Sequence, residues 1–237
     1  MSAVRSKSGS WPLEERGEPV LLEGAPEIAI EHLTFGYAGQ AEPVFKDFSF
    51  TFQGGEMTAI SGHTGIGKST LIRLILALLR PQEGSIRVGG IPVSPNLRGN
   101  FMYVPQGNSL MSGTIRENLR LVAPEATDDQ LREALELAAA EFVFDLPEGL
   151  ETLCSEKGGG LSEGQAQRIA IARGLLHSGG ILVLDEATSA IDPETEERLL
   201  QNLSARFHGR KTILFISHRE AVTSAADAVL KIGAPQA

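Results

Sequence analysis

Residues 57–75 read MTAISGHTGIGKSTLIRLI, and this stretch decides the fold. A short, mainly apolar run predicts a buried strand, a glycine-rich turn follows, and leucine and isoleucine then recur at helical spacing. Within the turn, the residues Gly62, Gly67, Lys68 and Ser69 fit the pattern G-x-x-x-x-G-K-[ST]. Glycines let successive backbone N–H groups turn toward an anion, and the helix adds the positive end of its dipole. The strand, turn and helix therefore predict a phosphate-binding loop.

The side chains of this loop fit a nucleotide. Lys68 can reach the β- and γ-phosphate oxygens, and the Ser69 hydroxyl can ligate Mg²⁺. A random chain of this length matches the four fixed positions about once in a hundred, so the pattern alone is only suggestive. The strand before the loop and the helix after it make an ordinary glycine-rich turn improbable. The apolar run of the helix continues through Leu78 and Leu79, and Pro81 is expected to end it.

Other segments extend this alternation of strands and helices. Alternating apolar residues at 28–31 and 48–52 predict half-buried strands in a small antiparallel sheet. Residues 181–184 and 212–216 are uninterrupted apolar runs, typical of parallel strands that are buried on both faces. The predicted fold class is α/β: a P-loop NTPase core with a parallel sheet, an N-terminal antiparallel β subdomain and an inserted α-helical subdomain.

Two helix starts can be recognised from capping residues. Thr127, with Gln130 three positions later, forms a capping box and predicts a short amphipathic helix in the middle of the chain. Asp192 can cap a second helix in which Pro193 occupies the first position, where its missing N–H costs nothing.

The chain is expected to divide into a tail and one domain. Residues 1–26 are rich in Ser, Gly, Glu and Pro and show little periodicity, so they are interpreted as a linker or mobile tail. Residues 27–237 are expected to form one folded domain, with the helical subdomain at about 107–178.

The composition of the chain limits the classes of partner and the cellular compartment that can be expected. The chain has 237 residues and a formal net charge of -9, which disfavours a nucleic acid as the main partner. Cys154 is the only cysteine, so an internal disulfide is excluded and a reducing compartment such as the cytosol is expected. No stretch approaches the roughly 20 apolar residues that span a bilayer, and no secretory signal is recognised. Any membrane part is therefore expected elsewhere.

A pair of carboxylates ends the apolar run at 181–184. Alternation along the strand points Asp185 and Glu186 in different directions. Asp185 can then face a Mg²⁺ ion while Glu186 faces the γ-phosphate and the attacking water. Two acids at the end of a strand would be ordinary on their own, but beside a phosphate loop they resemble a Walker B segment.

Residues 161–173, which read LSEGQAQRIAIAR, carry the most specific resemblance. They resemble the signature motif of the ATP-binding cassette (ABC) family, and the resemblance extends from about residue 27 to near the C-terminus. It implies that Tyr37 stacks on adenine, that Gln106 is the Q-loop residue and that His218 is the switch histidine. It also implies that residues 189–192 form the D-loop. These elements all occur in the order of the family, so chance agreement is negligible.

The resemblance implies ATP and Mg²⁺ as cofactors and a site shared by two cassettes. ATP would lie between two copies arranged head to tail, with the phosphate loop of one facing the signature motif of the other. The implied residues are Glu186 and His218 for catalysis; Tyr37, Gly62, His63, Thr64, Gly65, Ile66, Gly67, Lys68, Ser69, Thr70 and Gln106 for ATP; Ser162, Gly164 and Gln165 for the ATP of the partner; Asp192 in the D-loop; and Ser69, Gln106 and Asp185 for the metal.

Three segments, at 102–106, 113–118 and 156–158, look like the exporter branch of the family. In exporters the cassette usually follows six membrane helices on one chain. The implied partners are therefore a second cassette and a transmembrane domain, on the same chain or on a separate one. The implied function is ATP hydrolysis that powers export, at the cytoplasmic face of a membrane.

Glu163 departs from the family pattern, which commonly has glycine at this position. A carboxylate facing the nucleotide at about 4 Å would cost roughly 1 to 4 kcal/mol over effective dielectric constants of about 80 to 20. A side chain turned to solvent would cost little. We expect the solvent-facing arrangement, because Ser162, Gly164 and Gln165 are all retained.

Two alternative functions fit the sequence less well. Non-transport cassette ATPases of DNA repair or translation usually insert a long coiled coil between the phosphate loop and the signature, or carry two cassettes, and this chain does neither. A nucleotide-gated module that does not hydrolyse ATP is disfavoured by the presence of Glu186 and His218. The identity of the cargo belongs to the membrane domain rather than to the cassette.

Overall fold

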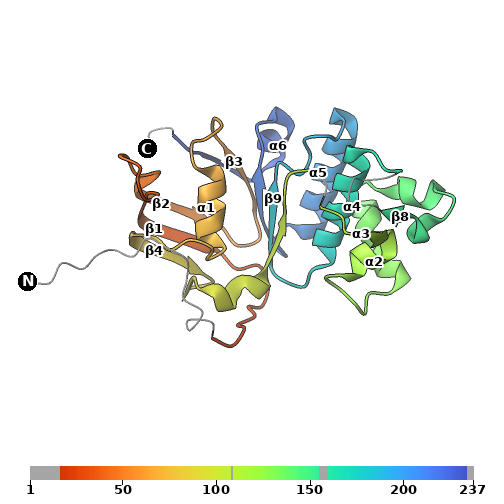
Figure 1. The fold of residues 1–237 in the computed structure, drawn as a ribbon, viewed down its shortest axis with the longest axis horizontal. Coiled ribbons are helices and arrows are strands. Elements are labelled where there is room, and N and C mark those ends of the chain that lie inside the picture. The colour runs from red at the N-terminus through yellow and green to blue at the C-terminus, as the bar shows by residue number, and fades with distance from the viewer. Residues whose placement is uncertain (1–16, 108, 155–159, 234–237) are drawn as a thin grey trace, which may run out of the picture.

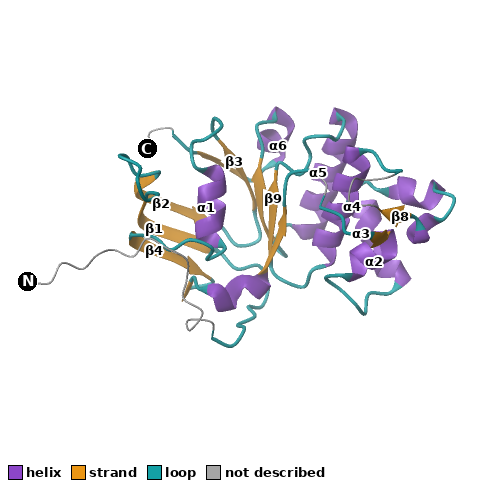
Figure 2. Cartoon of the chain, in the orientation of Figure 1, coloured by secondary structure: helices purple, strands orange, loops and turns teal. Residues whose placement is uncertain are grey.

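The computed structural model describes residues 17–107, 109–154 and 160–233 (Figure 1). Strands and helices are interspersed along this length, and among the described residues from 153 to 231 they alternate one by one (Figure 2). The strands are β1 (Ile28–Phe35), β2 (Phe45–Phe52), β3 (Met57–Ser61), β4 (Glu83–Val88), β5 (Ile91–Pro92), β6 (Phe101–Val104), β7 (Gly113–Thr114), β8 (Leu153–Cys154), β9 (Ile181–Asp185), β10 (Thr212–Ile216) and β11 (Ala228–Lys231). The helices are α1 (Lys68–Ile75), α2 (Ile115–Arg120), α3 (Asp128–Leu137), α4 (Glu163–Leu176), α5 (Pro193–Phe207) and α6 (Glu220–Ala225), with 3₁₀ turns η2 (Pro95–Asn100), η3 (Glu141–Asp145) and η4 (Gly149–Glu151).

Two main sheets organise the chain, and together they confirm the predicted fold class. The antiparallel sheet has the order β2-β1-β4-β5, and the parallel sheet has the order β11-β3-β10-β9-β6. In the parallel sheet, Ile216 of β10 lies opposite Ile60 of β3 and Asp185 of β9. Because the strands run in the same direction, the loops that follow β3, β9 and β10 meet at one edge of the sheet.

The parallel sheet separates two hydrophobic cores (Figure 1). On one face, Val183 and Leu214 pack with the apolar side of α1 and with the antiparallel sheet. On the other face, Leu182 and Phe215 pack with α4, α5 and the helices of the middle region. The phosphate loop and the signature helix therefore belong to opposite faces of the same sheet.

Helix α1 ends earlier than the sequence predicted. The apolar run was expected to stay helical through Leu79, but the helix ends at Ile75, and Leu78 is 46% exposed. Ala77 adopts a left-handed conformation with a φ of 52°. Its N–H donates to Leu74 O in the last turn of the helix (3.0 Å), and Leu78 N donates to Arg73 O (2.8 Å). This pattern is a Schellman termination, which stops a helix without needing a proline.

Arg98 completes the end of α1 from another part of the chain. Its Nε donates to Leu76 O at 3.0 Å, and its Nη2 donates to Ala77 O at 2.6 Å. The last carbonyl groups of a helix have no partners within the helix, so these two bonds satisfy groups that would otherwise need water. Arg98 lies 22 residues beyond Leu76, and for this reason the local sequence pattern did not predict the end of the helix.

The helix starts predicted from capping residues are confirmed. Thr127 caps α3 in a full capping box with Gln130. Asp192 caps α5 by accepting a hydrogen bond from Thr195 N at 2.9 Å, and Pro193 is the first residue of that helix.

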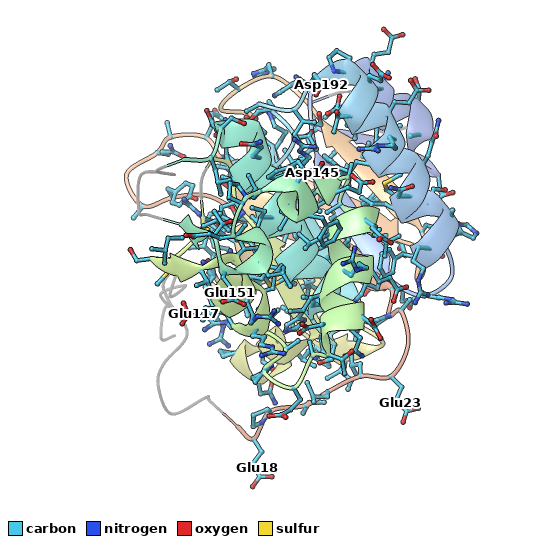
Figure 3. The ribbon with its side chains drawn as sticks, turned by 90° about the vertical axis from the view of Figure 1, so that its right-hand side faces the viewer. Glu18, Glu23, Glu117, Asp145, Glu151 and Asp192 are labelled. Carbon is cyan, nitrogen blue, oxygen red and sulfur yellow. The ribbon has the colours of Figure 1, made fainter. Side chains whose placement is uncertain are left out.

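The segment before β1 is joined to the fold by hydrogen bonds. Residues 1–16 of the expected linker lie outside the described residues, whereas 17–26 follow a path without helix or strand. The buried Asn100 accepts from Leu22 N (2.7 Å) and donates to Val20 O (2.7 Å), and Thr212 Oγ1 donates to Pro26 O (2.7 Å). Figure 3 shows Glu18 and Glu23 of this segment at the end opposite Asp192. The boundary at residue 27 and the limits of the helical subdomain stay predictions.

Among residues 17–107, 109–154 and 160–233, no helix has the length and apolar character that a bilayer crossing requires.

Replacing Arg98 with alanine is expected to lower the free energy of unfolding by about 1 to 3 kcal/mol, because two helix-end carbonyl groups lose a charged donor. Arg87 offers a matched control, since its exposed guanidinium donates to Gly90 O at 3.1 Å and caps no helix. Arg87→Ala should change stability by no more than about 0.5 kcal/mol. Urea denaturation followed by circular dichroism measures both variants. Equal losses in the two would contradict the capping role of Arg98.

Candidate active site

The phosphate loop joins β3 to α1, as the sequence predicted. Its residues Gly62, His63, Thr64, Gly65, Ile66 and Gly67 lead directly into Lys68, Ser69 and Thr70 of the first helical turn. Gly67 has a φ of 118°, and a Cβ atom there would lie 2.6 Å from a methyl group of Val44. Gly62 has a φ of 149°, and a Cβ there would lie 2.9 Å from Ile232 O. Both positions therefore require glycine for conformation and for space.

The start of α1 offers donors to an anion. Its N-cap residue is Gly67, which has no side chain, so no N-cap side chain accepts a hydrogen bond from the first N–H groups of the helix. Lys68 is buried, and its Nζ donates to Gly62 O (2.6 Å) and His63 O (3.2 Å). This ammonium group is therefore held across the mouth of the loop, where phosphate oxygens would meet it. Ser69 is exposed at the helix start.

The two carboxylates after β9 have different partners. Asp185 Oδ2 accepts a hydrogen bond from the Tyr103 hydroxyl at 2.7 Å. Glu186 Oε2 accepts a bond from Gln106 Nε2 at 2.9 Å, and Glu186 Oε1 lies 3.7 Å from His218 Nε2. The two carboxylates therefore have separate partners, and both Gln106 and His218 lie at Glu186, which follows the strand in a left-handed conformation with a φ of 50°.

Tyr103 was not identified from the sequence. It comes from β6, the edge strand of the parallel sheet, and it reaches Asp185 only because β6 pairs with β9. Burial and the hydrogen bond to Asp185 raise the pKa of Tyr103, so the phenol is neutral and donates at physiological pH. Strand alternation alone assigns Tyr103 to one face of the parallel sheet. Which residue of β9 lies next to it on that face depends on the register between the two strands, which the sequence does not show.

Tyr37 lies beside the start of α1. Its hydroxyl is 3.1 Å from Thr70 Oγ1, and its ring meets Phe35 edge to face with the centroids 5.2 Å apart. The ring is thus fixed next to the phosphate loop, where the resemblance implied an aromatic surface for adenine.

The signature motif opens α4. Ser162 is the N-cap of this helix, and it forms a capping box with Gln165. A Cβ at Gly164 would lie 2.4 Å from Ala190 O, so a glycine is needed where α4 touches the D-loop. Glu163 is exposed in the first turn of the helix, as is Ser162, so its direction relative to the nucleotide of a partner stays a prediction.

The D-loop, residues 189–192, is held on two sides. From α4, the buried Gln167 donates to Ser189 Oγ and accepts from Ala190 N, both at 3.0 Å. From the other side, Arg219 donates to Ile191 O at 2.9 Å and to Ser189 O at 3.3 Å. The D-loop is therefore attached to the signature helix and to the residue that follows His218.

Arg219 is itself fixed by an ion pair. Its Nη1 lies 2.9 Å from Oε2 of Glu196, a residue of α5 that is 1% exposed. Neither Arg219 nor Gln167 was given a role from the sequence. Their roles depend on contacts between segments 22 to 30 residues apart, which no local pattern contains.

The residues at this edge fit a magnesium nucleotide. Ser69, Asp185 and Gln106 offer hydroxyl, carboxylate and amide oxygens, the ligand class that Mg²⁺ prefers. Within the described ranges, no group of three or more His, Cys, Asp or Glu side chains could hold a metal.

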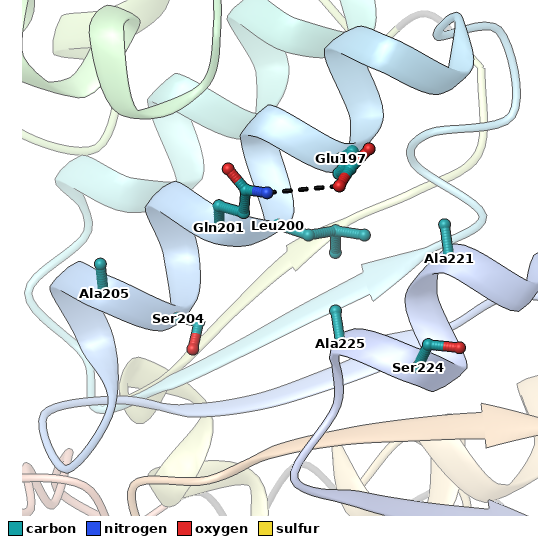
Figure 4. Close-up of a pocket in the computed structure, with 8 residues that line it drawn as sticks. All are labelled: Glu197, Leu200, Gln201, Ser204, Ala205, Ala221, Ser224 and Ala225. Atoms are coloured by element: carbon teal, nitrogen blue, oxygen red, sulfur yellow. Dashed lines mark hydrogen bonds between the residues drawn. The ribbon is translucent and has the colours of Figure 1, made fainter.

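A groove of about 680 Å³ lies elsewhere, between α5 and α6 (Figure 4). Its lining is mostly small residues, with Leu200 at its base and Glu197 and Gln201 on one side. It contains none of the residues discussed above.

Comparison with known proteins gives a consistent result. A family model described as ABC transporter matches residues 45–189, more than half of the chain. The chain is 39% identical to the probable multidrug resistance ABC transporter ATP-binding/permease protein YheI of Bacillus subtilis, over 90% of this chain and 37% of that protein. It is 38% identical to the mitochondrial iron-sulfur clusters transporter ATM1 of Candida glabrata, over 88% of this chain and 29% of that protein.

A solved structure supports the same fold. A bacterial Atm1-family ABC exporter with ATP bound matches with a TM-score of 0.83 and 32% identity, over 92% of this chain and 40% of that chain. The chain therefore spans well under half the length of these relatives. The resemblance inferred from the sequence is confirmed, although the exporter-like residues 156–158 lie outside the described residues. Since the family model covers more than half of the chain, and the solved structure that matches 92% of it is an ABC exporter, the chain belongs to the ABC transporter family as an exporter-type ATP-binding domain.

Proposed function

We propose that the chain hydrolyses Mg-ATP to power export through a transmembrane domain, located on the same chain or on a separate one. One observation carries the proposal: the phosphate loop, the carboxylates of Asp185 and Glu186, and His218 all follow strands that end at one edge of the parallel sheet. Phosphoryl transfer needs mainly positioning and charge neutralisation, and these are the groups that supply both.

Each residue has a distinct part in the proposed reaction. Lys68 and the N–H groups of the loop bind the phosphates, and Tyr37 stacks on adenine. Ser69, Asp185 and Gln106 would hold Mg²⁺, which when bound neutralises phosphate charge. Glu186 orients the attacking water, and His218, 3.7 Å from Glu186, contacts the γ-phosphate.

The proposed working unit is a head-to-tail dimer. Helix α4 and helix α1 pack on opposite faces of the sheet, so Ser162, Gly164 and Gln165 are poorly placed for the ATP of their own chain. The N-terminus of α4 would instead offer N–H groups and its dipole to the γ-phosphate bound by the partner. ATP then joins the two copies, and hydrolysis separates them.

The proposed location is the cytoplasmic face of a membrane, through attachment to the transmembrane domain. The relatives support this proposal because their names describe ATP-binding/permease proteins. A nucleic-acid partner is not proposed, since the net charge of -9 would repel a phosphate backbone.

Dimerisation is expected to depend on ATP. Without nucleotide the chain should be monomeric, because the proposed interface is polar and bridged by ATP. Glu186→Gln with Mg-ATP should elute as a dimer in size-exclusion chromatography, since the variant binds but does not hydrolyse. Mg-ADP serves as the control and should leave a monomer. A stable dimer without nucleotide would contradict the proposal.

The chemical step is expected to require Glu186 and His218. Alanine at either position should reduce kcat by about 10² or more while ATP affinity changes little. Lys68→Ala should instead weaken ATP binding, because the ammonium group meets the phosphates before the reaction as well as during it. His208 is an exposed histidine 3.6 Å from Asp227, and His208→Ala provides a matched control with unchanged turnover. Near-normal hydrolysis in both the Glu186 and His218 variants would refute the assignment.

Glu163→Gly is expected to leave maximal hydrolysis within a few fold of the wild type. The melting temperature should fall slightly, because a carboxylate in the first turn of a helix contributes about 0.3 to 1 kcal/mol. Dimerisation of the Glu186→Gln protein with and without Glu163→Gly, at low and high salt, provides the second measurement. A salt-sensitive gain of tenfold or more on removing the carboxylate would mean that Glu163 faces the nucleotide after all.

A further inference from the structure

Tyr103 and Asp185 form a contact, and Tyr103 has no role in the reaction proposed above. The phenolic oxygen of Tyr103 lies 2.7 Å from Asp185 Oδ2. A hydroxyl that donates to a carboxylate at this distance makes a charge-assisted bond, roughly twice as strong as a bond between neutral groups. Such a bond restricts the rotation of the carboxylate about its last torsion angle.

The register of the sheet determines this contact. Tyr103 lies opposite Val183, and Asp185 is two residues further along β9. Residues two apart on a strand share a face, so Tyr103 and Asp185 are diagonal neighbours on one side of the sheet. Val183 belongs to the hydrophobic core that includes α1, and this face is therefore the one on which the phosphate loop opens its helix.

The contact also occupies one particular oxygen. Tyr103 takes Oδ2, which leaves Oδ1 of Asp185 for another ligand. Three residues after Tyr103, Gln106 makes the corresponding bond to Glu186 Oε2 at 2.9 Å. One short segment thus donates to both carboxylates, and each carboxylate keeps its second oxygen for other contacts.

We propose that Tyr103 is a positioning residue for the magnesium nucleotide: its hydroxyl holds Asp185 Oδ2 so that Oδ1 faces the metal and its waters. The inference rests on the proposed role of Asp185 at Mg²⁺. Hydrogen bonds to a ligating group fix its orientation, and their loss typically costs about 10- to 100-fold in metal affinity. Tyr103 acts on the metal only through Asp185.

The test compares nucleotide binding with and without the metal. The affinity of a fluorescent, non-hydrolysable ATP analogue is measured in EDTA and across a Mg²⁺ titration, for wild type, Tyr103→Phe, Asp185→Asn and the double variant. Tyr103→Phe removes only the hydroxyl of a side chain that is 37% exposed, and melting curves verify the fold. Affinity in EDTA should be unchanged, while the Mg²⁺ concentration at half-saturation should rise roughly tenfold.

The double variant separates positioning from a general loss of the site. In the Asp185→Asn background, Tyr103→Phe should produce no further shift, because the carboxylate that it orients is gone. The inference is overturned by an unchanged Mg²⁺ half-saturation in Tyr103→Phe, by an equal loss of affinity in EDTA, or by the same shift in the Asp185→Asn background. If Asp185→Asn left the Mg²⁺ dependence unchanged, the proposed role of Asp185 would fail first, and the inference would fail with it.

Discussion

The parallel pairing of β10 with β3 on one side and with β9 on the other is the constraint on which the site depends. Ile216 stands opposite both Ile60 and Asp185, so the loops after the three strands leave the sheet at the same level. Hydrogen bonds continue this pairing beyond the strands, from Glu186 N to Ile216 O at 3.0 Å and from Ser217 N to Ile60 O at 3.3 Å. A slip of one residue between β9 and β10 would turn Asp185 to the opposite face and remove it from the side of α1. The phosphate loop, the carboxylates and His218 can act together only in this register.

The same sheet divides the functional parts, and the D-loop reconnects them. The phosphate loop belongs to one face and the signature helix to the other. Gln167 of the signature helix and Arg219, directly after His218, both hold residues 189–192. The ion pair with Glu196 fixes the guanidinium of Arg219, and removing one partner of a buried pair is costly. In the proposed dimer, a displacement of His218 would therefore be transmitted through Arg219 to the D-loop and to the helix that serves the ATP of the partner.

Sequence patterns predicted those features of the molecule that depend on residues close together in the chain. The phosphate loop, the strand before it and the capped starts of α3 and α5 depend on residues a few positions apart, and the structure confirms them. The early end of α1 was not predicted, because Ala77 takes an uncommon left-handed conformation and Arg98 caps the helix from 21 residues away. Tyr103 was missed for the same reason, since its partner lies 82 residues further along the chain. The roles of the site residues came from the family resemblance, and the structure adds which of those side chains touch.

Glu186 gives the clearest physical reason to assign chemistry to this edge. It has a φ of 50°, in the left-handed region that a residue with a Cβ atom adopts at a cost of about 1 to 3 kcal/mol. Glycine or asparagine would adopt this conformation more cheaply, so stability alone does not favour glutamate. The left-handed turn directs the carboxylate away from Asp185 and toward Gln106 at 2.9 Å and His218 at 3.7 Å. Asp185 ends the strand and bonds to Tyr103, whereas Glu186 in its left-handed turn contacts Gln106 and His218, so the two carboxylates have different partners. In the proposed reaction, that separation would allow one carboxylate to serve the metal while the other orients the water.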